Sequence, residues 1–212
     1  MEYASGLDTA LTCVTDHRSV ALRCLHVSQG EPVTDYVVKP LDASTWDAFA
    51  RLVERHNGVF GGCWCTYFHT FHAEKTFTVE GNRTLKKRLV EEGRAHAALV
   101  FDGDEAVAWC QYGPPEELPN IYHRKEYEAA IDKPPDYRIT CIFVDKKHRR
   151  EGVTAVALGG AVDLIAQAGG GVVEAVGPQS WCSAASWSSP FMSRACSALR
   201  RGRAPTRRFV VN

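Results

Sequence analysis

The sequence lacks a long apolar run. None of its apolar stretches approaches the roughly 18 residues that a membrane-spanning helix needs. The N-terminus also lacks the basic start and apolar block that mark a signal peptide. With 212 residues, 45% of them hydrophobic and 24% charged, the chain can bury one sizeable core. These features predict a soluble, cytoplasmic protein with one domain, or one domain with appendages.

A disulfide framework is missing as well. Eight cysteines in a chain of 212 residues do not make a disulfide-rich scaffold. Cys110 and Cys141 lie inside apolar, strand-like runs, where a free thiol behaves as a small hydrophobic group. The cysteine usage therefore favours a reducing compartment.

Negative charge is absent from the end of the chain. No Asp or Glu follows Glu174, and residues 178–212 contain seven Ser, six Arg and two Trp. The formal net charge is −2 over residues 1–31, −4 over 32–177 and +6 over 178–212. Neither end shows a sustained hydrophobic period. We therefore expect a core at 32–177, a disordered atypical extension before it and an atypical Ser/Arg-rich tail after it.

The change in composition near residue 176 is abrupt. It is typical of translation in the wrong reading frame of a GC-rich gene. We therefore hypothesise that the tail is out of frame, and that the start before about residue 32 is over-extended. In that case the sheet would end at the strand 172–176 and leave an open edge.

The middle of the chain alternates between strand and helix periods. Apolar strand-like runs lie at 36–41, 97–101, 106–112, 137–144 and 172–176. Helical stripes run from Ser44, which resembles the start of a capping box, to Asn57-Gly58, then over 82–96, and from Gly152 onward. This order predicts an α/β (α+β) domain with helices flanking a sheet.

The most informative segment is the loop between the strand 137–144 and the helix that follows. It reads His148-Arg149-Arg150-Glu151-Gly152-Val153-Thr154. A glycine at a helix start lets the backbone approach an anion, and the first amide N–H groups of a helix are free to bind phosphate oxygens. Two arginines add positive charge at the same place. The alternative is an ordinary strand–helix turn with a solvated basic run.

The pattern Arg149-x-x-Gly152-x-Thr154, opening an alanine-rich helix, resembles the acetyl-CoA loop of the GNAT acetyltransferase superfamily. The last position of that loop is usually Gly or Ala, so Thr154 is a mild departure. The resemblance covers about residues 34–176. It implies a mixed, mostly antiparallel sheet flanked by helices, with an incomplete or atypical C-terminal part.

The resemblance also implies a cofactor site for acetyl-CoA as co-substrate. In this superfamily the strand before the loop diverges from its neighbour, and its exposed backbone pairs with the pantetheine arm. The residues of this chain at the corresponding positions are Ile142, Phe143, Val144, Arg149, Arg150, Glu151, Gly152, Val153 and Thr154.

The activity that the resemblance implies is transfer of an acetyl group from acetyl-CoA to an amine. A base must take the ammonium proton of the acceptor, and in the superfamily it is often a Glu on the strand before the loop. Here that stretch is Asp136-Tyr137-Arg138, so Asp136 is a weak candidate, and a solvated Asp is the alternative. A non-catalytic acyl-CoA-binding or regulatory protein of the same fold is therefore the second interpretation.

A second unusual segment joins cysteines, histidines and aromatic residues between Gly61 and His72. Cys63, Cys65, His69 and His72 invite a zinc hypothesis, but Cys-x-Cys is tighter than the usual ligand spacing. We therefore expect no metal there. If the fold is GNAT-like, this segment lines the acceptor pocket, with Trp64, Tyr67 and His69 facing the amine; core packing is the equal alternative.

The expected partner is a small-molecule or peptide amine acceptor. A nucleic-acid partner is not expected, because the Arg-rich tail lacks lysines and lacks aromatic residues placed on a defined sheet. No membrane partner is expected either, and the sequence does not indicate the oligomeric state.

Overall fold

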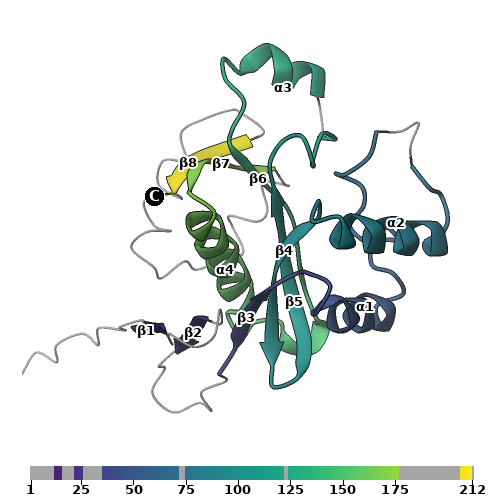
Figure 1. The fold of residues 1–212 in the computed structure, drawn as a ribbon, viewed down its shortest axis with the longest axis vertical. Helices are drawn as coiled ribbons and strands as arrows, with labels where there is room; N and C mark the ends of the chain where they lie inside the picture. The colour runs from purple at the N-terminus through teal and green to yellow at the C-terminus, as the bar shows by residue number, and fades with distance from the viewer. Residues whose placement is uncertain are drawn as a thin grey trace, which may run out of the picture.

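A central sheet with helices on both faces forms the described part of the protein (Figure 1). The computed structural model describes residues 12–15, 22–25, 35–71, 75–121, 124–176 and 206–211. The strands are β1 (Thr12–Thr15), β2 (Leu22–Leu25), β3 (Val37–Pro40), β4 (His96–Asp102), β5 (Glu105–Gly113), β6 (Tyr137–Val144), β7 (Gly171–Val176) and β8 (Thr206–Val211). They lie in the sheet in the order of the sequence.

Every neighbouring pair of strands is antiparallel except β6 and β7, which are parallel. A parallel pair needs a crossover connection, and α4 (Val153–Gln167) supplies it. The predicted fold class is therefore confirmed: the sheet is mixed, mostly antiparallel and flanked by helices. β1 and β2 are short strands in a stretch where the sequence predicts none.

The two faces of the sheet have different covers. α1 (Trp46–Arg55) and α2 (Val79–Glu91) lie on one face, and α4 lies on the other (Figure 1). α3 (Arg124–Ala130) lies near the end of the sheet where β6 begins. No helix among the described residues is long and apolar enough to cross a membrane.

Two hydrophobic clusters follow from this arrangement. Under α1, Phe49 contacts Trp109 of β5 with ring centroids 5.2 Å apart, and Trp109 stacks on Phe143 of β6. Under α4, Ala157 and Ile165 are fully buried against strand residues of the opposite face. The sheet is therefore apolar on both sides, as expected for a sheet between helical layers.

The start of α1 differs from the predicted capping box. The N-cap is Thr45, which makes no side-chain cap bond. The turn is held by Asp42, whose carboxylate accepts hydrogen bonds from the backbone N–H groups of Ser44 and Thr45 at 2.8 and 3.1 Å. An Asx turn therefore replaces the cap that Ser44 was expected to provide.

The second predicted helix, 82–96, is displaced toward the N-terminus. α2 begins after Thr78, whose side chain accepts a hydrogen bond from Gly81 N–H at 3.0 Å. It ends at Glu91, and Gly93 then adopts a positive φ of 67°. His96 already belongs to β4, because the left-handed turn at Gly93 stops the helix.

The expected open edge at β7 is wrong for the described residues. β8 pairs with all six residues of β7, from Gly171 opposite Val211 to Val176 opposite Thr206. Arg208 of β8 donates to the buried carboxylate of Glu174 at 3.1 Å and to the Lys133 carbonyl at 2.7 Å. Residues 177–205 lie outside the described residues, so the reading-frame hypothesis stays a prediction.

A matched pair of glycines in α4 tests its packing on the sheet. A Cβ at Gly160 would lie 2.5 Å from a methyl of Val38 in β3, whereas a Cβ at Gly159 would meet nothing within 4 Å. Gly160→Ala should therefore destabilise the protein by about 1–3 kcal/mol through overpacking. Gly159→Ala should stabilise it by about 0.5–1 kcal/mol, because alanine loses less backbone entropy in a helix. Urea unfolding of both variants measures this, and equal shifts would contradict the packing of α4 on β3.

Candidate functional site

The sheet forks between β6 and β7. β6 pairs with β5 from Arg138 to Val144, but it pairs with β7 only at Tyr137, Arg138 and Ile139. From Thr140 onward the described residues give β6 no partner on the β7 side. The second half of β6 therefore presents a free backbone edge inside the sheet, which is where the resemblance places the pantetheine arm.

The hydrogen-bond alternation of an antiparallel pair decides which residues point to the open side. Asp145 N–H donates to Val107 O at 2.8 Å, so residues two and four positions earlier in the same register, Phe143 and Cys141, also face β5. The N–H and C=O groups of Ile142 and Val144 therefore point into the fork. Arg149 supports this, since its Nε donates to Val144 O at 3.4 Å.

The fork leads directly into the glycine loop. After β6 a short 3-10 helix spans Lys146–His148, and Gly152 caps α4 with a positive φ of 77°. Within the described residues, the N–H groups of Gly152, Val153 and Thr154 donate no hydrogen bond, as is usual at a helix start. These three amides and the positive end of the α4 dipole form an anion-binding group.

Arg149 and Arg150 are both exposed beside these amides. Arg150 has a φ of 74°, a left-handed conformation that is costly for a residue with a side chain. The loop therefore holds the backbone in a sparsely populated conformation next to two exposed cations. This combination suits a multiply charged phosphate ligand.

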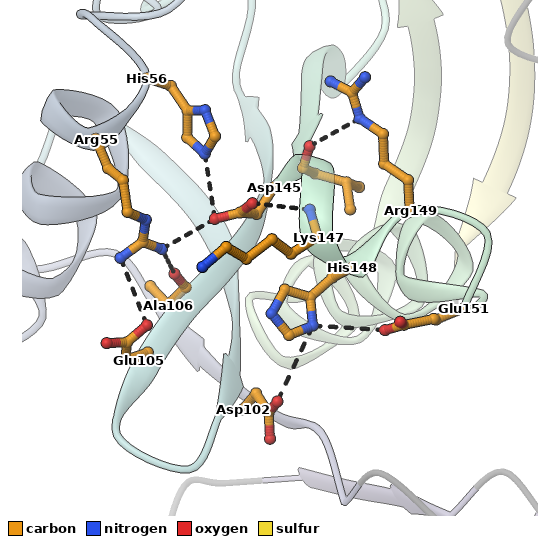
Figure 2. Close-up of polar contacts among 11 residues, drawn as sticks. Arg55, His56, Asp102, Glu105, Ala106, Asp145, Lys147, His148, Arg149 and Glu151 are labelled. Carbon is orange, nitrogen blue, oxygen red and sulfur yellow. Dashed lines mark hydrogen bonds and ion pairs between the residues drawn. The ribbon is translucent and has the colours of Figure 1, made fainter. Parts of the chain in front are cut away.

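An ionic contact fixes the loop to α1 (Figure 2). The buried Asp145 carboxylate lies 3.2 Å from Arg55 Nη2 and 3.2 Å from His56 Nε2, both at the end of α1. It also accepts a hydrogen bond from Lys147 N–H at 3.0 Å. Burial alone would raise the pKa of Asp145, but these hydrogen bonds and the nearby positive charge lower the pKa to about 2. Asp145 is therefore ionised under ordinary conditions.

Glu151 is turned toward the sheet. Its carboxylate accepts a hydrogen bond from Tyr36 Oη at 2.8 Å. It also lies 3.5 Å from His148 Nδ1 (Figure 2). His148 also lies 4.0 Å from Asp102. Of the residues expected at the cofactor, Glu151 thus holds the loop in place through its side chain.

A row of buried polar side chains lies on the other side of β6. Lys86 Nζ of α2 lies 2.7 Å from Gln111 Oε1 and 3.0 Å from His69 Nε2. Gln111 Nε2 then donates to Thr140 Oγ1 at 3.0 Å. Thr140 is the first residue of β6 without a β7 partner, so the row ends where the fork opens.

The charges in this row are set by burial. Burial lowers the pKa of Lys86 to about 8, although nearby cysteines oppose the shift, and no carboxylate of the described residues pairs with it. Burial and then repulsion from Lys86 lower the pKa of His69 well below its usual value. His69 Nδ1 lies 2.9 Å from Glu117 O and must donate to it, so its Nε2 is the acceptor for Lys86.

Sequence reasoning missed Lys86, Gln111 and Thr140. Lys86 lies in α2 beside the exposed lysine Lys87, and the two identical residues alone do not indicate which side chain is buried. The one available signal is the helical stripe: Lys86 lies three positions before Leu89 and four before Val90, both buried. Gln111 and Thr140 each interrupt an apolar strand, which marks them as buried polar residues only once the sheet is known.

The three expected acceptor residues are separated by the structure. Trp64 is fully buried and stacks on Trp46 with ring centroids 6.1 Å apart, which is core packing. His69 joins the buried row. Tyr67 is half-buried, with Lys75 Nζ 3.8 Å from its ring centroid. His72 lies outside the described residues, and those described contain no group of three or more His, Cys, Asp or Glu arranged to hold a metal ion.

Asp136 lies at the closed end of the fork. Its Oδ2 accepts a hydrogen bond from Val172 N–H at 2.7 Å, and its backbone N–H donates to Val172 O at 2.8 Å. The residue therefore holds the start of β7 against the start of β6, whether or not it also takes a proton.

Comparisons with known proteins give matches to solved structures alone. No protein-family model and no curated protein matches the chain. Solved structures that align with it include a putative GNAT-family acetyltransferase from Desulfovibrio desulfuricans, with 16% identity, 84% of this chain and 99% of that chain covered, and a TM-score of 0.43. An N-acetyltransferase from Staphylococcus aureus Mu50 has 10% identity, the same two coverages and a TM-score of 0.45.

A mosquito arylalkylamine N-acetyltransferase (like 5b) aligns with 13% identity, covering 78% of this chain and 82% of its own, with a TM-score of 0.44. All three are acetyltransferases, and the first is described as a member of the superfamily that the sequence resembles. At these TM-scores and identities the likeness carries no argument about activity or substrate. The mixed sheet and its fork come from the strand pairing alone.

The buried Lys86 makes a testable contribution to stability. Its pKa of about 8 lies below the ordinary value of 10.5, so the unfolded chain binds more protons between these two pH values. The free energy of unfolding should therefore rise with pH through this window. Lys86→Met should remove that part of the rise. The free energy of unfolding of the wild type minus that of the variant should therefore increase from about pH 7 to about pH 10.

The control is Lys87→Met, which removes a lysine that is 48% exposed and pairs with Glu91 at 3.7 Å. Its effect should stay within about 0.5 kcal/mol and show no comparable trend. Urea unfolding at several pH values measures both. If the two variants follow the same pH trend, Lys86 does not have a depressed pKa.

Proposed function

We propose that the protein is an N-acetyltransferase that moves an acetyl group from acetyl-CoA to the amine of a small molecule or peptide. The observation that carries the proposal is the continuity of the fork between β6 and β7 with the loop from Arg149 to Thr154. One ligand with an amide-bearing arm and a pyrophosphate would use both features at once. The setting we propose is cytoplasmic, in keeping with the free thiols of the core.

The loop would hold the phosphates. The pyrophosphate oxygens would accept hydrogen bonds from the amides of Gly152, Val153 and Thr154, with Arg149 and Arg150 supplying positive charge. Gly152 is exposed, and beyond its neighbours in the chain no atom of the described residues lies within 4 Å of the place its Cβ would occupy, so the backbone is open to a ligand.

The open edge of β6 would hold the pantetheine arm. Ile142 offers its backbone N–H and C=O there and Val144 its N–H, so the amides of the arm can pair with the strand as a further strand would. The Phe143 side chain lies in the hydrophobic cluster under α1 and stacks on Trp109, with ring centroids 4.6 Å apart. This contact keeps this stretch of β6 in place.

The chemistry would be direct transfer. The amine nitrogen attacks the thioester carbonyl carbon, the carbon–sulfur bond breaks, and the thiolate leaves with a proton supplied from the site. The protein contributes by holding both reactants in line and by donating an N–H to the carbonyl oxygen as negative charge develops there. The thioester would lie near Thr140, where β6 and β7 diverge.

The acceptor would approach from the side of the α1–α2 connection. Of the three residues expected there, Tyr67 is the one with exposed surface, whereas His69 could act through the buried row that ends at Thr140. Asp136 remains the acid nearest the start of β6, and we keep it as the proposed base. Its existing bond to Val172 N–H leaves one carboxylate oxygen for a proton.

A second candidate is a non-catalytic acyl-CoA-binding or regulatory protein. The observation that favours it is the absence of any Asp or Glu within Tyr137–Val144, together with the bond that already engages Asp136. Calorimetry with CoA and thiol release from acetyl-CoA over a panel of amines separates the two. Binding with amine-dependent thiol release supports the enzyme, and binding without release supports the second candidate. No binding contradicts both.

The loop assignment can be tested with two isosteric variants. Gly152→Asp and Gly152→Asn share one shape, and both residue types tolerate the left-handed conformation that φ of 77° requires. The carboxylate of Gly152→Asp should repel the phosphates and abolish CoA binding. Gly152→Asn should retain most of it. Equal affinities in the two variants, by calorimetry, would contradict a phosphate at this helix start.

Arg149→Ala should weaken CoA binding by about 1–3 kcal/mol, the range for hydrogen bonds to charged groups. The matched control is Arg94→Ala, which removes an exposed arginine paired with Glu92 at the far end of α2. That variant should bind CoA as wild type does. An equal loss of CoA affinity in both variants would show that affinity depends on the overall positive charge of the protein and not on a contact made by Arg149.

A further inference from the structure

Two cysteines far apart in the sequence meet in the core. Cys65 follows α1, and Cys141 lies in β6, yet their Sγ atoms are 2.9 Å apart. Both residues are buried, with exposures of 2% and 8%. A disulfide bond is about 2.05 Å long, so closing the gap requires the two sulfurs to approach by about 0.9 Å.

A third thiol connects this pair to the surface. Cys63 is half-buried, two residues before Cys65, and interaction with the Cys65 thiol is the largest influence that raises the pKa of Cys63. Trp64 and Cys65 both have positive φ values, 47° and 51°, so the backbone between the two cysteines is held in a tight left-handed turn. The three sulfurs therefore form a row from the surface to β6.

Opposing influences act on the charge of these sulfurs: the Cys65 thiol and burial raise the pKa of Cys63, and the Cys141 thiol and burial raise that of Cys65. Attraction to Lys86 partly offsets this rise in the pKa of both Cys63 and Cys65. His69, its other ionisable neighbour, stays neutral through burial. Only a thiolate attacks a disulfide, so this cation assists exchange at the row.

We propose that Cys63, Cys65 and Cys141 form a thiol–disulfide exchange site, whose oxidised product is a Cys65–Cys141 bond between the α1–α2 connection and β6. The oxidant is a small organic disulfide. The Cys63 thiolate attacks it and releases one small thiol. Cys65 then attacks the Cys63 sulfur of the mixed disulfide, which forms a Cys63–Cys65 bond and releases the second small thiol. In total, one small disulfide and two protein thiols give one protein disulfide and two small thiols.

The final step moves the bond inward. A bond between Cys63 and Cys65 would close a very small ring across a strained turn, so attack by Cys141 on Cys65 relieves it and frees Cys63 again. The product joins the connection to the strand whose next residue is Ile142. The site does not depend on the proposed acetyl transfer, because its reaction needs neither acetyl-CoA nor an amine.

The test is a disulfide map of the full chain. The protein is incubated with oxidised glutathione, free thiols are blocked under denaturing conditions, and the chain is cut after Lys and Arg. We expect the peptide 56–75 joined to the peptide 139–146 with the loss of two hydrogen atoms. Hydrogen bonds among the thiols and burial raise the pKa of Cys63, and the bond with Cys141 raises that of Cys65, so formation should speed up from about pH 7 to about pH 9.

Single variants assign the bond. Cys65→Ser and Cys141→Ser should abolish the joined peptide, and Cys63→Ser should slow its appearance but still give it. Cys110→Ser, at a buried cysteine of β5, is the control and should change nothing. Melting curves before oxidation verify that each variant is folded, and Cys→Ala replaces any that is not. Glutathione left on Cys63 alone, a bond only between Cys63 and Cys65, or a joined peptide that persists in Cys65→Ser would overturn the proposal.

Discussion

The candidate site depends on the place where β6 stops pairing with β7. Three residue pairs hold the strands together, and after Ile139 they diverge. Backbone groups on a free edge inside a domain need partners, and an edge without them is costly. A ligand with its own amides is one way to supply those partners, and a helix start at the end of the same strand is well suited to the charged part of such a ligand.

Buried charge stabilises both ends of the fork. At the closed end, Glu174 has no exposed surface and its carboxylate accepts from Tyr127 Oη at 3.0 Å and from Arg208, with Arg138 at 3.7 Å. At the open end, Asp145 joins the loop to α1. Removing one partner of such a contact leaves a buried charge without compensation, which costs far more than the contact contributes. The geometry of the fork is therefore held by groups that no ligand has to touch.

Much of the fold follows from the sequence, because the residues that set it act locally. The strand 137–144 and the glycine loop were predicted within a residue, since apolar alternation and a helix-starting glycine are local signals. The prediction of Ser44 as the cap of α1 was wrong because three side chains, those of Asp42, Ser44 and Thr45, compete for the same backbone groups. Only the turn geometry decides among them. The buried row from Lys86 to Thr140 could not be predicted, because its members come from α2, β5 and β6. β8 was missed because its partner lies 30 or more residues earlier in the chain.

The pairing of β8 with β7 also has a consequence for synthesis. During translation β7 leaves the ribosome well before Arg208, so Glu174 is made before the cation that lies nearest to it, at 3.1 Å against 3.7 Å for Arg138. The sheet can close only when residues 206–211 have emerged, and until then one face of α4 lacks the cover of Val211. Folding of this domain is therefore completed after, and not during, the synthesis of its core. If translation stalled before β8, the chain would have β7 without its partner strand, and Glu174 would lack its contact with Arg208.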